Sequence, residues 1–299
     1  MNTPRQTATY LKQRFADVGM WPTARRGQNF LIDLNLLEVL LHHADVGPND
    51  VVLEIGTGTG SLTARLAQQA AAVVTVEVDP QLAQLASETL VDLPNITLLR
   101  QDALRNKNHI DDRVLQALQD AVQAGPNRRL KLVANLPYNI ATPILSNLLT
   151  TPIVPVSMTS TIQKELAERI VAPPRTKDYS ALSIWLQSLC DVELLRVLPP
   201  TVFWPRPKVE SAFIQIVPND AKRALIPDLD FYHHFVRSLF LHRRKFLRSG
   251  LLSTWKQSLG KDGVDQVMAE LRLDASTRAE ELDIPSIQRL CSAVRCRLP

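Results

Sequence analysis

The sequence predicts an α/β fold with a seven-stranded, mostly parallel sheet, followed by a small all-α domain. In residues 1–218, short apolar runs of strand length alternate with helical patterns, which is typical of a parallel sheet. The last two predicted strands follow each other with no helix between them, which indicates an antiparallel edge. Beyond a linker at Pro218–Asp230 only helical patterns remain, so we expect domains at 1–218 and 219–299.

Length and charge limit the possible functions. The 299 residues, 45% of them hydrophobic, are enough for one large core and a smaller one. The net charge is +4, and the pI is near 9.0. The last 81 residues hold 14 Lys and Arg against 10 Asp and Glu, whereas the rest of the chain is balanced. A basic C-terminal part is weakly indicative of a polyanionic partner.

Cysteine, histidine and hydropathy patterns exclude several classes. Cys190, Cys291 and Cys296 are too few and too irregular for a disulfide framework or a zinc site, which favours a reducing compartment. The histidines have no metal-ligand spacing, so no metal is expected. Because no run has secretory or membrane-spanning length, we expect a cytoplasmic protein that does not enter a membrane. No dimerisation seam is evident, so a monomer is expected.

The N-terminal part reads as a short helix and a polar segment. A helix is predicted over Thr9–Val18, and the basic, Gly-containing stretch Arg25–Asp33 follows. Residues 1–32 would form an entry or lid segment, although the spacing of Arg25–Asp33 alone favours a plain loop. Asp33 is a good N-cap for a helix whose apolar side carries Leu36, Leu37, Leu40 and Leu41.

A strand, a glycine turn and a helix then form the first unit of a nucleotide-binding sheet. The strand Val51–Ile55 precedes Gly56-Thr57-Gly58-Thr59-Gly60, and a helix is predicted over Ser61–Ala71. Glycines let a ligand approach the backbone. A dinucleotide site would need its third glycine where Ser61 stands, so NAD is disfavoured.

Two carboxylates follow the next two strands. Glu77 lies near the end of the strand Val73–Val78, about 21 positions after Gly56, where it would accept hydrogen bonds from ribose hydroxyls. Asp102 follows the strand Ile96–Arg100 and could accept from the amine of a base, although taken alone it could be an ordinary loop aspartate. The polar stretch Arg105–Arg129 is expected to be a surface elaboration.

The most informative motif follows the strand Leu130–Ala134 and reads Asn135-Leu136-Pro137-Tyr138. Pro137 disfavours a helix at this point, which leaves backbone carbonyls free to accept from a ligand. An amide oxygen, free carbonyls and a Tyr ring would suit a flat group with an exocyclic amine. The alternative is a Pro-terminated strand and turn with Tyr138 in the core.

The remaining elements complete the sheet and the terminal domain. Helices are predicted at Thr142–Leu149, Lys164–Val171 and Tyr179–Leu189, and strands at Val154–Ile162, Val192–Leu198 and Ser211–Val217. In the loop Pro199–Lys208, Phe203 could stack on an extruded base or equally fill the core. A helix over Phe231–Leu252 carries basic residues that could bind phosphates, lie on a membrane or simply be solvated.

Eight short motifs then occur in an order that resembles one family. They are Gly27-Gln28-Asn29-Phe30-Leu31, Val52-Leu53-Glu54-Ile55-Gly56, Val76-Glu77-Val78-Asp79, Asp102-Ala103-Leu104, Asn135-Leu136-Pro137-Tyr138-Asn139-Ile140, Gln163-Lys164-Glu165-Leu166-Ala167-Glu168-Arg169, Pro205-Arg206-Pro207-Lys208-Val209-Glu210-Ser211 and Arg243-Arg244-Lys245-Phe246-Leu247-Arg248. Over nearly its whole length the chain resembles the KsgA-type rRNA adenine dimethyltransferases. Thr57 and Gln101, where the family often has Pro and Gly, are mild departures.

The resemblance implies a Rossmann-like class I methyltransferase domain with S-adenosylmethionine (SAM) as cofactor and a C-terminal rRNA-binding domain. It implies transfer of two methyl groups to N6 of each of two adjacent adenosines near the 3′ end of small-subunit (16S) rRNA, with a role in small-subunit biogenesis. The implied cofactor-binding residues are Asn29, Leu31, Gly56, Gly58, Glu77, Asp102 and Asn135. The implied catalytic residues are Asn135, Leu136, Pro137, Tyr138 and Phe203. The implied RNA-binding residues are Arg206, Lys208, Arg243, Arg244, Lys245 and Arg248.

Three alternatives remain at this point. Methyltransferases of large-subunit rRNA share the implied fold but resemble Asn-Ile-Pro-Tyr at the central motif. A ribosome-assembly or transcription factor on the same scaffold need not catalyse a reaction. A DNA adenine methylase usually carries Pro-Pro before the aromatic residue, which Leu136-Pro137 does not match.

Overall fold

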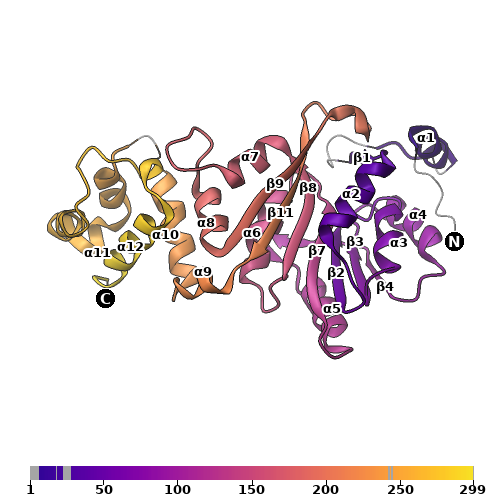
Figure 1. The fold of residues 1–299 in the computed structure, drawn as a ribbon, viewed down its shortest axis with the longest axis horizontal. Helices are drawn as coiled ribbons and strands as arrows, with labels where there is room; N and C mark the ends of the chain where they lie inside the picture. Colours follow the sequence, from indigo (N-terminus) through magenta and orange to yellow (C-terminus); the bar gives the residue numbers. More distant parts are fainter. Residues whose placement is uncertain (1–6, 18, 23–27, 242, 244, 299) are drawn as a thin grey trace. The chain divides into compact units, whose positions relative to one another are not determined.

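The computed structural model describes residues 7–17, 19–22, 28–241, 243 and 245–298 (Figure 1). Its backbone contacts divide the chain into two compact units. The first comprises Met1–Ala167 and Glu193–Pro218, and the second comprises Glu168–Val192 and Asn219–Pro299. The second unit is therefore not one continuous segment, because it adds Glu168–Val192 to the residues that follow Pro218.

A seven-stranded sheet in the order β4–β3–β2–β7–β8–β11–β9 is the centre of the fold. The strands are β2 (Asp50–Ile55), β3 (Ala72–Val76), β4 (Ile96–Leu99), β7 (Arg129–Asn135), β8 (Ser157–Gln163), β9 (Cys190–Leu198) and β11 (Ser211–Pro218). β4, β3, β2, β7 and β8 run parallel, and β11 is antiparallel to β8. The mostly parallel, seven-stranded α/β fold is confirmed. The predicted closing pair, β9 and β11, forms one edge of the sheet, with the antiparallel β11 between β8 and β9.

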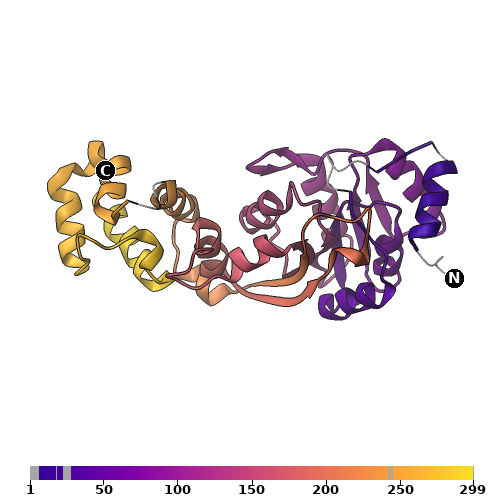
Figure 2. The same ribbon diagram turned by 90° about the horizontal axis from the view of Figure 1, so that it is seen from above.

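Helices cover both sides of this sheet (Figure 2). They include α2 (Leu34–Ala44), α3 (Ser61–Ala67), α4 (Pro80–Leu90), α5 (Asp112–Gln123), α6 (Ala141–Asn147) and α7 (Lys164–Val171), with a 3-10 turn at Leu148–Thr150. Asp33 caps α2 as predicted, since its side chain accepts from the amides of Asn35 and Leu36. Leucines of α2 and α3 pack with Val52, Val73 and Val133 of the strands in one buried cluster.

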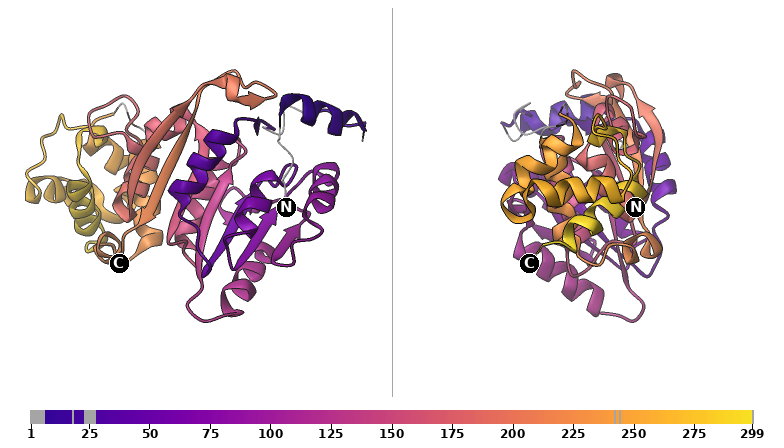
Figure 3. Two further views of the ribbon diagram at one scale, coloured as in Figure 1. Left: turned by 45° about the vertical axis from the view of Figure 1, so that its right-hand side comes forward. Right: turned by 90° about the vertical axis from the view of Figure 1, so that its left-hand side faces the viewer.

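Two stretches differ from the sequence prediction within the first unit. The segment expected to be a surface elaboration contains a short hairpin, β5 (Leu104–Asn106) with β6 (His109–Ile110), and then α5, which packs on β2, β3 and β7 through Val114 and Leu118. The predicted lid segment and the Pro-rich loop meet in a two-stranded sheet of β1 (Phe30–Leu31) and β10 (Phe203–Trp204) (Figure 3). Helix α1 (Ala8–Asp17) belongs to the predicted lid segment, of which residues 1–6, 18 and 23–27 lie outside the described residues.

The second unit is helical, with α8 (Ala181–Leu189), α9 (Asp220–Ala224), α10 (Leu229–Leu241), α11 (Leu247–Glu270) and α12 (Ile284–Arg295). Short 3-10 turns occur at Pro200–Val202 in the first unit and at Ala279–Glu281 in the second. The expected single helix over Phe231–Leu252 is wrong, because Phe246 is extended and forms a β-bridge with Arg278, which separates α10 from α11. The expected linker likewise contains α9. In the described ranges no helix is both long and apolar enough to span a bilayer.

Candidate active site

A pocket opens where β2, β3 and β7 end, at the carboxyl edge of the parallel sheet. Its cavity of about 200 Å³ is more than ten times the ~10–15 Å³ that one water needs, so it has room for a ligand. All seven residues expected to bind the cofactor line it: Asn29, Leu31, Gly56, Gly58, Glu77, Asp102 and Asn135. The pocket therefore brings together side chains that are up to 106 positions apart in the sequence.

The glycine turn forms a wall of this pocket and leaves no space for side chains. Gly56 and Gly58 have φ angles of 87° and 60°, which other residues rarely adopt. A Cβ atom on Gly56 would lie 3.3 Å from the Pro137 ring, and one on Gly58 would lie 3.0 Å from the Phe30 ring. The turn therefore touches both the lid segment and the Asn135–Tyr138 motif, and exposes its own backbone to the pocket.

Glu77 is held rigidly although it faces the pocket. Its carboxylate oxygens accept from the amides of Gly58 and Asp79, each at 2.9 Å. Burial raises the pKa of Glu77, whereas these amide hydrogen bonds act in the opposite direction. Each carboxylate oxygen has a second lone pair, so Glu77 can still accept from a hydroxyl of a bound ligand.

Asp102 is the exposed acid of the pocket. Its Oδ1 accepts from the Leu104 amide at 2.9 Å, an interaction that orients the side chain after β4. No described residue donates to its other oxygen, Oδ2, which leaves that oxygen available to an amine.

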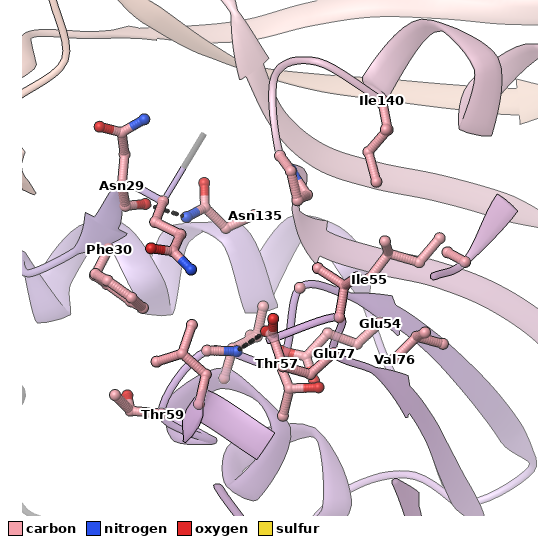
Figure 4. A pocket seen from close by; sticks show the side chains of 18 of the residues that line it. Asn29, Phe30, Glu54, Ile55, Thr57, Thr59, Val76, Glu77, Asn135 and Ile140 are labelled. Atoms are coloured by element: carbon pink, nitrogen blue, oxygen red, sulfur yellow. Dashed lines mark hydrogen bonds between the residues drawn. The ribbon is translucent and has the colours of Figure 1, made fainter. Parts of the chain in front are cut away.

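Asn135 lies at the end of β7 beside the glycine turn. Its Nδ2 donates to the Asn29 carbonyl at 2.7 Å, which turns the Oδ1 atom away from Asn29 (Figure 4). This hydrogen bond uses one of the two N–H groups of the amide and fixes the side chain, and Oδ1 remains available to accept from a ligand. The pocket shared by Asn135 and Gly56 is the arrangement expected if a cofactor and an amine substrate meet there.

The backbone next to Asn135 offers carbonyl acceptors at Leu136 and Pro137. The Pro137 carbonyl already accepts from the Ile140 amide at 3.1 Å, which closes a turn. The Leu136 amide donates to the Thr161 carbonyl of β8, and the Leu136 side chain is only 1% exposed. Among the described residues none donates to the Leu136 carbonyl, although Leu136 is not among the residues that line the pocket. Pro137 lines it, and its carbonyl retains a second lone pair, so either carbonyl could accept from a substrate.

The two aromatic residues of the predicted site lie outside the pocket lining. Tyr138 is half-buried, its hydroxyl is 2.6 Å from the Ser211 Oγ, and burial raises its pKa. Phe203 is 2% exposed and packs in the core cluster with Leu31 and Leu198. Phe203 therefore fills the core, which was one of its two predicted roles, rather than standing free to stack on an extruded base. The predicted stacking on a base needs a free ring face, which this packing does not leave.

Glu54, which is not among the site residues expected from the sequence, also lines the pocket. Glu54 is 1% exposed and accepts from the hydroxyls of Thr63 and Thr75. Burial raises its pKa to about 8. The sequence pattern that could have indicated a role for Glu54 is an acidic residue inside the otherwise apolar strand Val51–Ile55.

The basic residues predicted to bind RNA fall into two groups. Arg206 and Lys208 are exposed in the loop before β11, and Lys245 is exposed in the second unit. Arg243 instead forms an ion pair with Glu280, and Arg248 contacts both carboxylate oxygens of Asp265. Arg243 therefore links the segment just before α11 to the 3-10 turn at Ala279–Glu281, and Arg248 bridges two parts of α11 that the non-helical Gly260 separates. Arg244 lies outside the described residues.

Metal ligands do not accompany the pocket. In the described part of the chain, no group of three or more His, Cys, Asp and Glu side chains could hold a metal ion.

Comparison with known proteins identifies the family. The ribosomal RNA adenine dimethylase family matches residues 23–292. A ribosomal RNA small subunit methyltransferase A from Alkaliphilus metalliredigens is 38% identical over 271 residues, 91% of each chain. A dimethyladenosine transferase from Plasmodium falciparum shares the fold, with a TM-score of 0.74 and 22% identity over 89% of this chain and 97% of that one. The 23S rRNA methyltransferase ErmE does so with a TM-score of 0.61 and 24% identity over 89% and 99%. The chain therefore belongs to the ribosomal RNA adenine dimethylase family, as its eight motifs predict.

Proposed function

We propose that this protein uses SAM to dimethylate N6 of two adjacent adenosines near the 3′ end of small-subunit rRNA. As a family member it is an rRNA adenine dimethyltransferase; the donor, the nucleotides and the residue roles are the proposal. The observation that carries it is the single pocket in which Asn135, with its amide oxygen free, faces the glycine turn at Gly56.

The chemistry of the pocket fits SAM. The backbone of Gly56 and Gly58 is accessible, as close approach of a ligand requires. Glu77, fixed by two amides, would accept from the ribose hydroxyls, and the free Oδ2 of Asp102 would accept from the adenine amine. Leu31 and Asn29 would cover the ligand from the lid segment. When bound, SAM supplies a methyl group on a cationic sulfur that departs as a neutral thioether.

The same pocket offers a cradle for the amine to be methylated. The N6 amine of adenine delocalises its lone pair into the ring and is a poor nucleophile. Asn135 Oδ1 and the Leu136 or Pro137 carbonyl would accept its two N–H bonds and draw the nitrogen toward tetrahedral geometry, so that the lone pair faces the methyl group. Because the leaving group is neutral, no general acid is required. Rate acceleration would come from alignment and from fixed dipoles.

The target base must leave its stack to reach this cradle. Tyr138, held by Ser211 next to the cradle, would bound the space that the base enters, and Pro137 would shape it. Exposed Arg206 and Lys208 would contact phosphates close to the site, and Lys245, in the second unit, would contact phosphates of the same RNA. With rRNA as substrate, the protein would act in the cytoplasm, as a monomer, during small-subunit biogenesis.

The fold does not separate small-subunit from large-subunit substrates, because ErmE shares it. Two observations favour the small subunit. The central motif carries Leu136, where large-subunit enzymes resemble Asn-Ile-Pro-Tyr. The relative that is 38% identical is named for the small subunit.

The test is a parallel methylation assay. Purified protein and radiolabelled SAM are incubated with undermethylated small subunits, with large subunits and with duplex DNA. We expect label in the small subunit alone, recovered as N6,N6-dimethyladenosine at two neighbouring positions. Label only in the large subunit would refute the assignment, and loss of labelling in Asn135→Ala but not in the exposed Asn49→Ala would locate the reaction in this pocket.

A further inference from the structure

Glu54 occupies an unusual place for an acid. It lies on β2 opposite Thr75 of β3, lines the pocket and is nevertheless only 1% exposed (Figure 4). None of the roles assigned above uses it, although its carboxyl group is among the most deeply buried groups of the site.

The hydrogen bonds of Glu54 all go to one of its oxygens. Thr63 and Thr75 donate to Oε2 at 2.5 and 2.7 Å. The Thr75 hydroxyl donates its only proton to Glu54, so in its 2.6 Å contact with Thr57 it must accept, and the Thr57 hydroxyl donates. A chain of hydroxyls therefore links the glycine turn to this acid. Within the described ranges no residue donates to Oε1. A proton can therefore sit on Oε1 without breaking a hydrogen bond.

Glu54 forms no ion pair with any cation of the described residues. α3 and β3 contribute the hydroxyls of Thr63 and Thr75. The buried cation of β7, Lys131, lies opposite Val52 and forms an ion pair with Asp50 at 3.0 Å. The nearest charged influence is Glu77, which repels a second negative charge. Burial without a counter-charge raises the pKa of Glu54 to about 8, so the group is mostly neutral at pH 7.

We propose that Glu54 senses the charge of the methyl donor: it is neutral in the ligand-free pocket, ionises when the cationic sulfonium binds, and is reprotonated when the neutral thioether remains. This inference rests on the proposed function. On binding, the Oε1 proton passes to solvent. After transfer the sulfur keeps both electrons of its bond to the methyl group and loses its charge, and Glu54 takes a proton back from solvent. The proton of the methylated amine leaves separately.

The consequence is discrimination between donor and spent product. A carboxylate in this buried site attracts a sulfonium more strongly than it would in water. The protein would therefore bind SAM more tightly as the pH rises through the pKa of Glu54, whereas S-adenosylhomocysteine (SAH) would gain nothing from Glu54. This pH-dependent preference would favour release of SAH after each of the successive transfers.

Calorimetry of the wild-type protein tests the proton balance. Binding of SAM and of SAH is measured at about pH 7.5 in buffers of different ionisation enthalpy, which reports the protons exchanged. The two ligands share every titratable group, so the difference between them isolates the sulfonium. We expect SAM to release more protons than SAH. We also expect the SAM preference to rise between about pH 6.5 and 8.5, by up to about 10-fold for a pKa shift of one unit. Equal proton release would overturn the inference.

A substitution of Glu54 tests whether this residue is the source of the proton released on SAM binding. Glu54→Gln keeps the shape and the acceptor for both threonines but cannot ionise, so the difference in proton release should vanish. Glu88→Gln, a change at an exposed acid of α4, should leave the difference intact. If the difference survives in Glu54→Gln, another group such as Glu77 is responsible and the inference fails.

Infrared spectroscopy gives a second measurement that needs no variant. In the wild-type protein, SAM but not SAH should remove the band of a protonated carboxyl group; a band that persists with SAM refutes the inference. The outcome also separates the two proposals. A protein that binds neither ligand contradicts the proposed function, whereas one that binds both with equal proton release contradicts only the role of Glu54.

Discussion

Replacing Asn135 with Ala separates a catalytic role from a role in cofactor binding. The substitution removes Oδ1, the acceptor that would polarise the N6 amine, and also removes the 2.7 Å hydrogen bond to the Asn29 carbonyl. Loss of one preorganised polar group at a reacting centre costs about 2.7–4 kcal/mol, a fall in turnover of about 10²–10³-fold. The lost bond to Asn29 should cost about 0.5–1.5 kcal/mol, a weakening of SAM binding of about 2–10-fold.

The assay measures single-turnover methylation of small subunits and, separately, SAM affinity by calorimetry. Asn49→Ala, a change at an exposed residue before the other end of β2, is the matched control and should leave both quantities unchanged. Equal losses of turnover and of affinity in Asn135→Ala would show that Asn135 only shapes the cofactor pocket, and the amine cradle would have to be abandoned.

Three further predictions follow from other parts of the chain. Replacing Arg206 and Lys208 with Ala should weaken RNA binding and reduce the slope of log affinity against log salt by about one per residue, and an unchanged slope would exclude phosphate contacts. Phe203→Ala should lower the free energy of unfolding by about 3–5 kcal/mol in a denaturant titration, because the side chain is 2% exposed, whereas a loss below about 1 kcal/mol would mean that it is not a core residue. The pKa of Glu54, raised to about 8, lies above its unfolded value, so its contribution to stability is complete below about pH 4.5 and is lost as the pH rises through about 8. Melting temperatures of Glu54→Gln should therefore fall less than those of the wild type over this range, and parallel curves would contradict the shift.

The elements that lie next to each other along the chain could be predicted from sequence. The strand Asp50–Ile55, its glycine turn and the cap at Asp33 depend on local patterns of apolar residues, glycine and short polar side chains. The Asn135 motif and the two acids could be placed near one another, because parallel strands end at one edge of a sheet.

Features that depend on distant contacts could not be predicted in this way. The ladder of Phe30–Leu31 with Phe203–Trp204 joins segments more than 170 positions apart, and no local pattern indicates it. The burial of Phe203 follows from this ladder and from the core beneath it. The break between α10 and α11 depends on a bridge from Phe246 to Arg278, and helical periodicity continues across it. Likewise, the ion pairs of Arg243 and Arg248 become visible only once their acidic partners are placed.

The two-residue ladder between the lid segment and the Pro-rich loop couples the effects of substitutions in these two segments. Asn29, which holds Asn135, is adjacent to one strand of that ladder, while Trp204, next to the basic loop, belongs to the other and stacks on Phe15. A substitution on either side displaces the same small sheet, so changes at Asn29 and Trp204 should be epistatic rather than additive. Under the proposed function, cofactor binding and RNA binding would then evolve together, because substitutions that affect one would also affect the other.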